Sequence, residues 1–260
     1  MGILTYDSVS ISFGSTEVVH NVSFSLEQGE ILGLVGESGS GKTTLIKAGM
    51  GLLGANGRVS SGNIYFMGKN IADFSEKEFR KIRGAKLGMI FQDSAVSLCP
   101  VRTIGYQICQ SIHAHEKIST EDARKKAFDL FEKLNLSDAR RVWDSYPFEL
   151  SGGMNQRVGI AISMLMNPPV LFADEPTSAL DVVSQKQVVE EMLSLRKLFG
   201  TSIIIVTHDI SLISAMADTV LVLKDGNAVE YGEKKQILHN PSQEYTQTLM
   251  RAVPKIRRSK

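Results

Sequence analysis

One segment of the sequence has the residue types and spacing of a phosphate-binding loop. Residues 36–43 read Gly-Glu-Ser-Gly-Ser-Gly-Lys-Thr and match the pattern GxxxxGK[ST] in full, directly after the apolar run 31–35. Glycines let such a loop curl so that backbone N–H groups point at phosphate oxygens, and a helix beginning near Lys42 would aim its positive end at the same place. Lys42 would reach the β- and γ-phosphates, and the Thr43 hydroxyl would bind Mg²⁺. Since a chance match in a chain of this length is on the order of one per cent, the segment predicts nucleotide binding.

Two acidic residues follow another apolar run. Residues 170–173 are continuously apolar and lead into Asp174 and Glu175. Ligands of open α/β sheets bind at the carboxyl ends of the strands, so we expect Asp174 to hold Mg²⁺ directly or through water. Glu175 would then orient or deprotonate an attacking water. A plain strand-ending loop can have the same sequence, and the phosphate loop upstream is what favours the catalytic interpretation.

A second candidate anion site precedes an apolar helical run at 158–166. Its sequence is Leu150-Ser151-Gly152-Gly153-Met154. Ser151 suits the N-cap position, and the two glycines would expose backbone N–H groups at the start of the helix. Such a turn is often structural on its own, but in a chain with a phosphate loop it indicates a second phosphate-binding element.

The surrounding patterns predict the elements that position these residues. Val22, Phe24 and Leu26 alternate with polar residues, which predicts a half-buried strand, and 64–67 is a second short strand candidate. Continuously apolar runs predict strands buried on both faces of a parallel sheet, and they are 31–35, 89–91, 170–173 and 203–206. Helical patterns separate these runs, which favours an α/β fold with crossover helices.

The stretch from about Asp93 to Asn167 differs from the rest because it contains no convincing strand. Apolar residues recur there at helical spacing after a start signal at Ser119 and Thr120, and they are Ala127, Leu130, Phe131 and Leu134. We interpret this stretch as a helical insert within the α/β core.

Composition limits the classes of function. The chain has 260 residues, of which 43% are hydrophobic, too many for a disordered chain. A net charge of +1 gives no argument for a nucleic-acid or acidic-membrane partner. Two cysteines, Cys99 and Cys109, cannot form a disulfide framework, which favours a reducing compartment. No apolar run approaches the roughly 18 residues of a membrane span, so we expect any membrane role to come through a partner.

The order of these motifs resembles that of the ABC-transporter ATPases over nearly the whole chain. The resemblance rests on the phosphate loop, Gln92, Leu150–Gly153, Asp174-Glu175, Ser178-Ala179-Leu180-Asp181 and His208. It implies an α/β P-loop NTPase core with a mainly parallel sheet, an N-terminal antiparallel β lobe and an inserted helical subdomain. The implied layout is a single domain at 1–260, and its parts are a core at 1–92 and 168–250, a helical subdomain at 93–167 and a basic tail at 251–260.

The resemblance also implies a role for each matching residue. ATP and Mg²⁺ would lie between two subunits arranged head to tail. Phe13 would stack on adenine, and the phosphates would be held by Gly36, Ser38, Gly39, Ser40, Gly41, Lys42, Thr43 and Thr44. Gln92 would touch Mg²⁺ or water while sensing the membrane subunit, and His208 would contact the γ-phosphate. Ser151, Gly152 and Gly153 would grip the partner's γ-phosphate, and Asp181 would couple the two sites. Simpler alternatives stay open for three of them: a core side chain for Phe13, a surface residue for Gln92 and a structural histidine for His208.

Several stretches resemble the oligopeptide, dipeptide and nickel importer branch. They are 36–42, Phe91-Gln92-Asp93 through Ser97-Leu98, Thr103–Gly105, Met154, and Tyr245-Thr246 with Leu249. Two departures are Gln243-Glu244, where a His-Pro pair is usual, and Cys99, which replaces a common Asn. Long peptide-type members carry a further cysteine-containing C-terminal segment. Its absence here favours a short member such as a nickel or metal-chelate importer subunit, although peptides stay possible.

The expected function is therefore ATP hydrolysis that powers import of a peptide, nickel or a related small solute at the cytoplasmic face of the cell membrane. Expected partners are a second ABC ATPase subunit, identical or not, membrane permeases that contact 93–167 and, indirectly, an extracytoplasmic solute-binding protein. One alternative is an accessory ATPase of the kind associated with carbon–phosphorus lyase. The other is a DNA-binding chromosome or repair ATPase, which the near-neutral charge and the lack of a long coiled-coil insert disfavour, so no nucleic-acid partner is expected.

Overall fold

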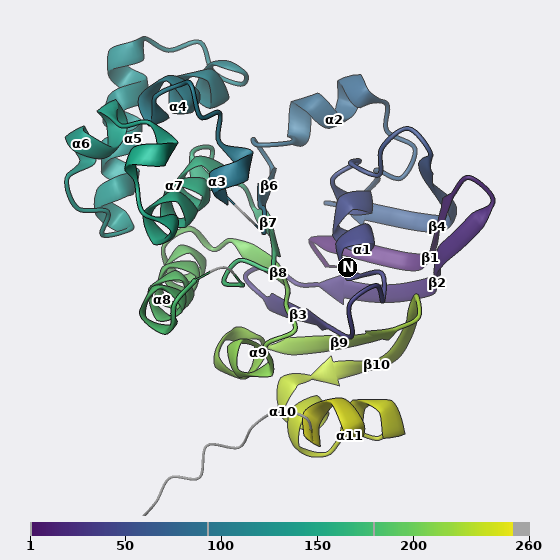
Figure 1. The fold of residues 1–260 in the computed structure, drawn as a ribbon. Coiled ribbons are helices and arrows are strands. Elements are labelled where there is room, and N and C mark those ends of the chain that lie inside the picture. The colour runs from purple at the N-terminus through teal and green to yellow at the C-terminus, as the bar shows by residue number, and fades with distance from the viewer. Residues whose placement is uncertain (1, 93, 179, 252–260) are drawn as a thin grey trace, which may run out of the picture. The chain divides into compact units, whose positions relative to one another are not determined.

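The chain forms two compact units in the computed structural model (Figure 1), which describes residues 2–92, 94–178 and 180–251. The first unit comprises Met1–Asp73 and Ile204–Lys260, and the second comprises Phe74–Ile203. The chain therefore returns to the first unit within strand β8, Ser202–Val206.

The first unit is built on a sheet of order β5-β4-β1-β2-β10-β9-β3-β8. Its other strands are β1 Leu4–Phe13, β2 Thr16–Leu26, β3 Ile31–Val35, β4 Gly57–Phe66, β5 Lys69–Asn70, β9 Thr219–Lys224 and β10 Asn227–Glu233. Antiparallel pairing joins β1 to β2 and to β4, as well as β4 to β5, whereas β3 and β9 are parallel. The predicted antiparallel β lobe is thus formed by the first strands of the chain.

The predicted periodicity of β2 is confirmed. Val22, Phe24 and Leu26 are buried, whereas Asn21 and Ser23 are exposed and Ser25 is half-buried. The Phe24 ring stacks on Tyr6 of β1, with 4.4 Å between the ring centroids. Strand β3, by contrast, is buried at every residue, as expected for a strand covered on both faces.

Four helices lie within the described residues of the first unit. They are α1 Lys42–Gly49, α9 Ile210–Met216, α10 Lys234–His239 and α11 Glu244–Arg251. Helix α1 begins at Lys42, as the phosphate-loop pattern predicts. Helix α11 packs on β10, and it lies close to the C-terminal end of the described chain.

The second unit has a parallel pair of strands, β6 Leu87–Ile90 and β7 Val170–Asp174. Every residue of β6 and β7 is buried. The prediction of a strand at 89–91 was wrong by one residue at its end: β6 stops at Ile90, and the Phe91 side chain is 44% exposed. Phe91 is apolar, but it follows the last residue of β6 and is not part of the strand that would bury it.

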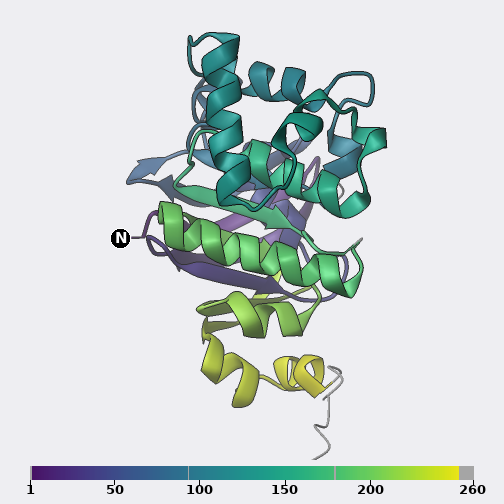
Figure 2. The ribbon, with the colours of Figure 1, turned by 90° about the vertical axis from the view of Figure 1, so that its left-hand side faces the viewer.

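The other elements described in the second unit are helices. They are α2 Glu76–Ile82, α3 Ser94–Ser97, α4 Ile104–His113, α5 Thr120–Lys133, α6 Ala139–Asp144, the 3₁₀ helix η1 Pro147–Glu149, α7 Gly152–Met164 and α8 Val182–Phe199. The start of α5 is confirmed, because the Ser119 Oγ accepts the Asp122 N–H at 3.1 Å. Figure 2 shows α8 as a long straight helix.

These strands and helices confirm the predicted α/β fold class. Every element described between residues 94 and 167 is helical. Within the part of the chain that the structure describes, no helix has the length and apolar character needed to cross a membrane.

Candidate functional site

The phosphate loop of the first unit connects β3 to α1 and rests on the turn between β9 and β10. The Gly226 N–H of that turn donates to the Ser40 carbonyl at 3.1 Å. Gly36 has φ +152°, and a Cβ built on it would lie 2.1 Å from the Leu223 carbonyl oxygen. Only glycine therefore fits where the loop leaves β3.

Lys42 reaches back into its own loop. Its Nζ donates to the Gly36 carbonyl at 2.9 Å, the Glu37 carbonyl at 2.7 Å and the Ser40 Oγ at 3.3 Å. The residue is 8% exposed, so its charge is desolvated and needs these oxygens. Ser38 and Gly39 at the tip of the loop are exposed, and their backbone is accessible to a ligand.

The other predicted residues of the first unit occupy the ends of strands and a helix. Phe13 ends β1 and is 38% exposed, so it is not a core side chain. Thr43 and Thr44 lie in the first turn of α1 and are half-buried. His208 is exposed and directly follows Thr207, whose N–H donates to the Leu34 carbonyl at 3.3 Å. His208 therefore lies at the end of β3 from which the phosphate loop departs.

Tyr245 contacts the phosphate loop, which the sequence interpretation did not anticipate. The Glu37 N–H donates to the Tyr245 hydroxyl at 3.3 Å. Tyr245 was noted only as part of a motif of the importer branch. A turn signal was also present in the sequence, since the Asp225-Gly226 pair, which follows the apolar run 220–223, is typical of a tight hairpin.

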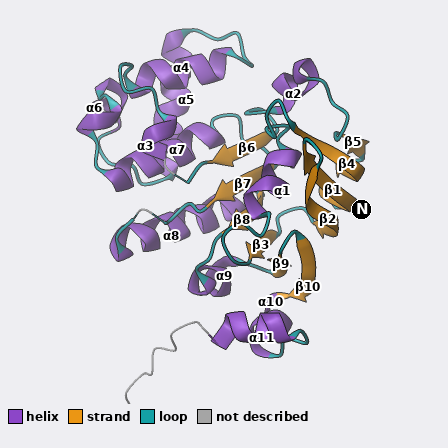
Figure 3. Cartoon of the chain, turned by 45° about the vertical axis from the view of Figure 1, so that its right-hand side comes forward, coloured by secondary structure: helices purple, strands orange, loops and turns teal. Residues whose placement is uncertain are grey.

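In the second unit, two predicted metal-binding residues share one edge of the parallel pair of β6 and β7, the strands drawn side by side in Figure 3. Ile90 is in register with Ala173, so Gln92 and Asp174 both lie at the carboxyl ends of these strands. Asp174 is 7% exposed, and Gln92 is exposed. The unit thus brings a carboxylate and an amide to the edge where parallel sheets bind ligands.

Glu175 has a left-handed backbone, with φ +48°. Its carbonyl accepts the Ser178 N–H at 3.2 Å and the Ser178 Oγ–H at 3.1 Å, and the Gln156 amide of α7 donates to the Pro176 carbonyl at 2.8 Å. A non-glycine residue in this conformation costs free energy and persists where its surroundings fix it. The hydrogen bonds around this turn provide that constraint.

The predicted helix start at Ser151 is confirmed. Its Oγ accepts the Met154 N–H at 3.3 Å and caps α7. A Cβ built on Gly153 would lie 3.0 Å from the Ser184 Oγ in the first turn of α8. The first turns of α7 and α8 are therefore side by side, and Gly153 permits this close approach. Nothing lies within 4 Å of a Cβ built on Gly152.

Asp181 acts as the N-cap of α8. Its Oδ1 accepts the Val183 and Ser184 N–H groups, both at 3.0 Å, and its Oδ2 accepts the Ser184 Oγ–H at 2.7 Å. The hydrogen bond from the Ser184 side chain is the main cause that lowers the pKa of Asp181. This capping role within the same chain is enough to explain why an aspartate occupies position 181.

Two predicted motif residues, Asp93 and Ala179, lie outside the described residues, as does the tail from residue 252.

Arg157 of α7 joins three helices, and the sequence interpretation missed it. It forms a buried ion pair with Glu191 of α8, and its Nη2 donates to the Leu134 carbonyl at 2.7 Å and the Asn135 carbonyl at 2.9 Å. These carbonyls belong to the C-cap residue of α5 and to the residue that follows it, so the hydrogen bonds fix the C-terminal end of that helix. Burial raises the pKa of Glu191 to about 6, although the Arg157 charge opposes the shift. The ion pair is a second contact between α7 and α8, further along the two helices than the contact at Gly153.

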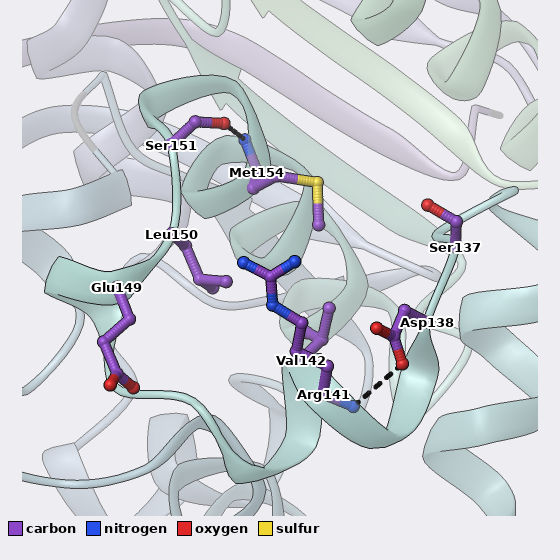
Figure 4. A pocket seen from close by; sticks show the side chains of 8 residues that line it. All are labelled: Ser137, Asp138, Arg141, Val142, Glu149, Leu150, Ser151 and Met154. Atoms are coloured by element: carbon purple, nitrogen blue, oxygen red, sulfur yellow. Dashed lines mark hydrogen bonds between the residues drawn. The ribbon is translucent and has the colours of Figure 1, made fainter.

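A small pocket lies beside the start of α7 (Figure 4). Its volume is about 240 Å³, and it is lined by Ser137, Asp138, Arg141, Val142, Glu149, Leu150, Ser151 and Met154. The Arg141 side chain points into it, whereas Glu149 points away. Small-molecule sites usually occupy roughly 300–1,000 Å³, so this pocket is not the expected nucleotide site.

The available donors fit Mg²⁺ by their chemistry. A hydroxyl on Thr43, a carboxylate on Asp174 and an amide oxygen on Gln92 are hard oxygen ligands. Among the described residues, no three His, Cys, Asp or Glu side chains cluster as a metal cage. Mg²⁺ commonly binds through one or two carboxylates together with substrate phosphates, so a single protein carboxylate is enough for the expected site.

Comparisons with known proteins agree with the motifs. Residues 19–178 match the family described as ABC transporter, and residues 229–260 match that described as oligopeptide/dipeptide transporter, C-terminal region. A dipeptide transport ATP-binding protein of Escherichia coli is 40% identical over 100% of this chain and 81% of its own. An oligopeptide transport ATP-binding protein of Bacillus subtilis is 41% identical over 99% of this chain and 73% of its own.

A solved structure has the same fold. It is a dimeric post-hydrolysis state of an ATP-binding cassette bound to ADP and Pi. The TM-score is 0.77 at 28% identity, and the match covers 89% of this chain and 98% of the other.

Proposed function

Because the chain belongs to the ABC transporter family and is an ATPase of that family, we propose that it powers import of dipeptides or oligopeptides. The observation that carries this proposal is the match of the whole chain to a dipeptide transport ATP-binding protein, with a separate match of residues 229–260 to the peptide-transporter C-terminal region. The relatives named above give no support to nickel as the solute. The proposal is therefore limited to peptides.

The residues of the phosphate loop hold the ATP phosphates in this proposal. Lys42 neutralises charge on the β- and γ-phosphates, and exposed backbone N–H groups of the loop bind their oxygens. Thr43, Gln92 and Asp174 hold Mg²⁺, which supplies positive charge to the phosphates when bound. Phe13 stacks on the adenine, and its exposed ring at the end of β1 supports this role.

Hydrolysis is assigned to Glu175 and His208. Glu175 orients or deprotonates the attacking water, and His208 contacts the γ-phosphate. The constrained backbone of Glu175 supports its role, because strain of this kind clusters at functional sites. The position of His208 at the end of β3, next to the phosphate loop, supports the second assignment.

Two subunits form the working ATPase, identical or not. Ser151, Gly152 and Gly153 contact the γ-phosphate held by the other subunit, and Asp181 couples the two sites. The dimeric state of the ADP-bound cassette of the same fold supports this arrangement. The open surroundings of Gly152 leave the start of α7 accessible to a phosphate.

The partners are membrane permeases that contact the helical segment 93–167 at the cytoplasmic face of the membrane. A solute-binding protein on the other side acts indirectly by delivering the peptide. The alternative, an accessory ATPase of the carbon–phosphorus lyase kind, receives no support from the relatives named above.

Purification of the tagged chain from its native cells separates the two assignments. The importer proposal predicts recovery with integral membrane permeases from detergent-solubilised membranes, and ATP hydrolysis by that complex that rises when peptide-loaded binding protein is added. Recovery with a soluble multienzyme complex, and without permeases, would contradict it.

A further inference from the structure

The C-terminal helix of the described chain reaches the nucleotide-binding loop of the same unit. Tyr245, in the first turn of α11, accepts the Glu37 N–H through its hydroxyl at 3.3 Å. The two residues are 208 positions apart in the sequence, so this contact exists only when α11 is docked.

The peptide group between Gly36 and Glu37 is held from both ends. Its N–H donates to the Tyr245 hydroxyl, and its carbonyl, that of Gly36, accepts the Lys42 Nζ at 2.9 Å. Rotation of this peptide group would move the carbonyl away from the ammonium. Tyr245 and Lys42 are therefore linked through one rigid, planar group.

Several contacts fix Tyr245 at this position. Glu230 of β10 accepts the Ser242 N–H at 2.8 Å and the Ser242 Oγ–H at 2.9 Å, just before α11 begins. The Lys224 ammonium lies 4.9 Å from the centre of the Tyr245 ring. Lys224 immediately precedes the turn at Gly226 that binds the Ser40 carbonyl. The same part of the sheet thus supports both the loop and the ring that contacts it.

The hydroxyl keeps its proton under ordinary conditions. Burial, together with the Glu37 and Asp225 carboxylates, raises the pKa of Tyr245. It is therefore a neutral group that accepts the loop N–H without adding negative charge next to bound phosphates.

We propose that Tyr245 is a positioning residue for ATP: its hydroxyl fixes the Gly36–Glu37 peptide group, which in turn holds Lys42 ready for the phosphates. This inference rests on the proposed function, because it needs the loop to bind ATP. It assigns to α11 control of nucleotide affinity, a role separate from the chemistry at Glu175.

The substitution Tyr245→Phe in the full chain tests this role, because it removes the hydroxyl and keeps the ring over Lys224. Loss of one ordinary hydrogen bond corresponds to a roughly three- to tenfold effect. We expect KM for ATP to rise by that factor, and kcat to stay within about twofold. The dissociation constant for ATP should rise likewise, whereas the weak affinity for adenosine, which lacks phosphates, should not change.

Tyr231→Phe is the matched control. The Tyr231 hydroxyl donates to the Ser25 carbonyl at 2.8 Å, in the same unit but toward the far end of β10 from the loop. We expect this variant to change the unfolding temperature about as much as Tyr245→Phe and to leave KM for ATP within about twofold.

An unchanged KM in Tyr245→Phe, or equal changes in KM in both variants, would overturn the inference. A fall in kcat without a rise in KM would overturn it as well. If the wild-type chain neither binds nor hydrolyses ATP, the proposed function itself fails. If wild-type kinetics and peptide transport are intact while Tyr245→Phe matches the wild type, only the role of Tyr245 fails.

Discussion

Lys42 shows how a buried charge can be held ready for a ligand. It donates to oxygens of its own loop, and the carbonyls of Gly36 and Glu37 are both within 2.9 Å of its Nζ. Hydrogen bonds from an ammonium to neutral carbonyl oxygens are weaker than those to a charged acceptor. A phosphate oxygen brought to the loop is therefore a favourable partner for the ammonium.

The substitution Lys42→Ala should weaken ATP binding by about ten- to a hundredfold, since hydrogen bonds to charged groups contribute roughly 1.5–3 kcal/mol. Calorimetric titration with ATP measures the effect. Lys47→Ala is the control, because Lys47 is an exposed lysine on the same helix. Wild-type affinity in Lys42→Ala would contradict the role of this residue.

Glu175→Gln separates binding from hydrolysis. The amide cannot accept a proton from water, so we expect turnover to fall by roughly 10²–10⁴, the usual contribution of a positioned acid or base. ATP binding should remain. Steady-state phosphate release measures turnover, and Glu190→Gln, an exposed carboxylate in the same unit, serves as the control. Unchanged hydrolysis in Glu175→Gln would rule out its assignment.

Sequence reasoning found the residues whose partners are close in the chain. Lys42 contacts atoms two, five and six positions away, and Ser151 caps a helix through an N–H three positions away. Tyr245 and Arg157 were missed because their partners are 208 and 34 positions away. Local patterns contain no information on such pairs, which depend on how the elements pack.

At the scale of elements, α7 and α8 are fixed to each other at two points. Their first turns meet where Gly153 approaches Ser184, and the Arg157–Glu191 ion pair joins them further along. The first turn of α7 holds the residues proposed to contact the partner's phosphate. A change in the ion pair should therefore alter the position of the first turn of α7, because both belong to the same helix.

The Glu191 ion pair predicts a pH dependence of stability. Its folded-state pKa of about 6 is above the ordinary 4.5, so the stability linked to proton binding is present below about 4.5 and lost as the pH rises through about 6. We expect the unfolding temperature of the wild type, relative to Glu191→Gln, to fall between about pH 5 and pH 7. Parallel thermal melts of the two proteins at several pH values give this difference. A difference that stays constant, or grows with pH, would contradict the assignment.

Among the elements, strands buried on both faces were the easiest to predict. Strands β3 and β6 are continuous apolar runs, β7 and β8 are apolar except for Asp174 and Ser202 at one end, and all four are buried along their length. The hairpin of β9 and β10 was not predicted, although it supports the phosphate loop. Strand β10 is half-exposed and carries glutamates and a glycine, so its sequence lacks the alternation that identified β2.

At the scale of the whole molecule, the chain combines a nucleotide-binding loop with no membrane-spanning helix among its described residues. In our account, ATP binding closes the dimer, hydrolysis opens it, and the permeases change their access accordingly. The near-neutral net charge of +1 is compatible with a surface that meets proteins rather than nucleic acid.

ATP-dependent uptake of a labelled dipeptide tests this account most directly. The measurement uses proteoliposomes that contain the permeases recovered with the chain, its solute-binding protein outside and ATP inside. We predict accumulation with the wild-type chain, and loss of accumulation with Glu175→Gln even though that variant still binds ATP. Equal uptake by the two proteins, or no ATP-dependent uptake of dipeptides or oligopeptides by the wild type, would contradict the account.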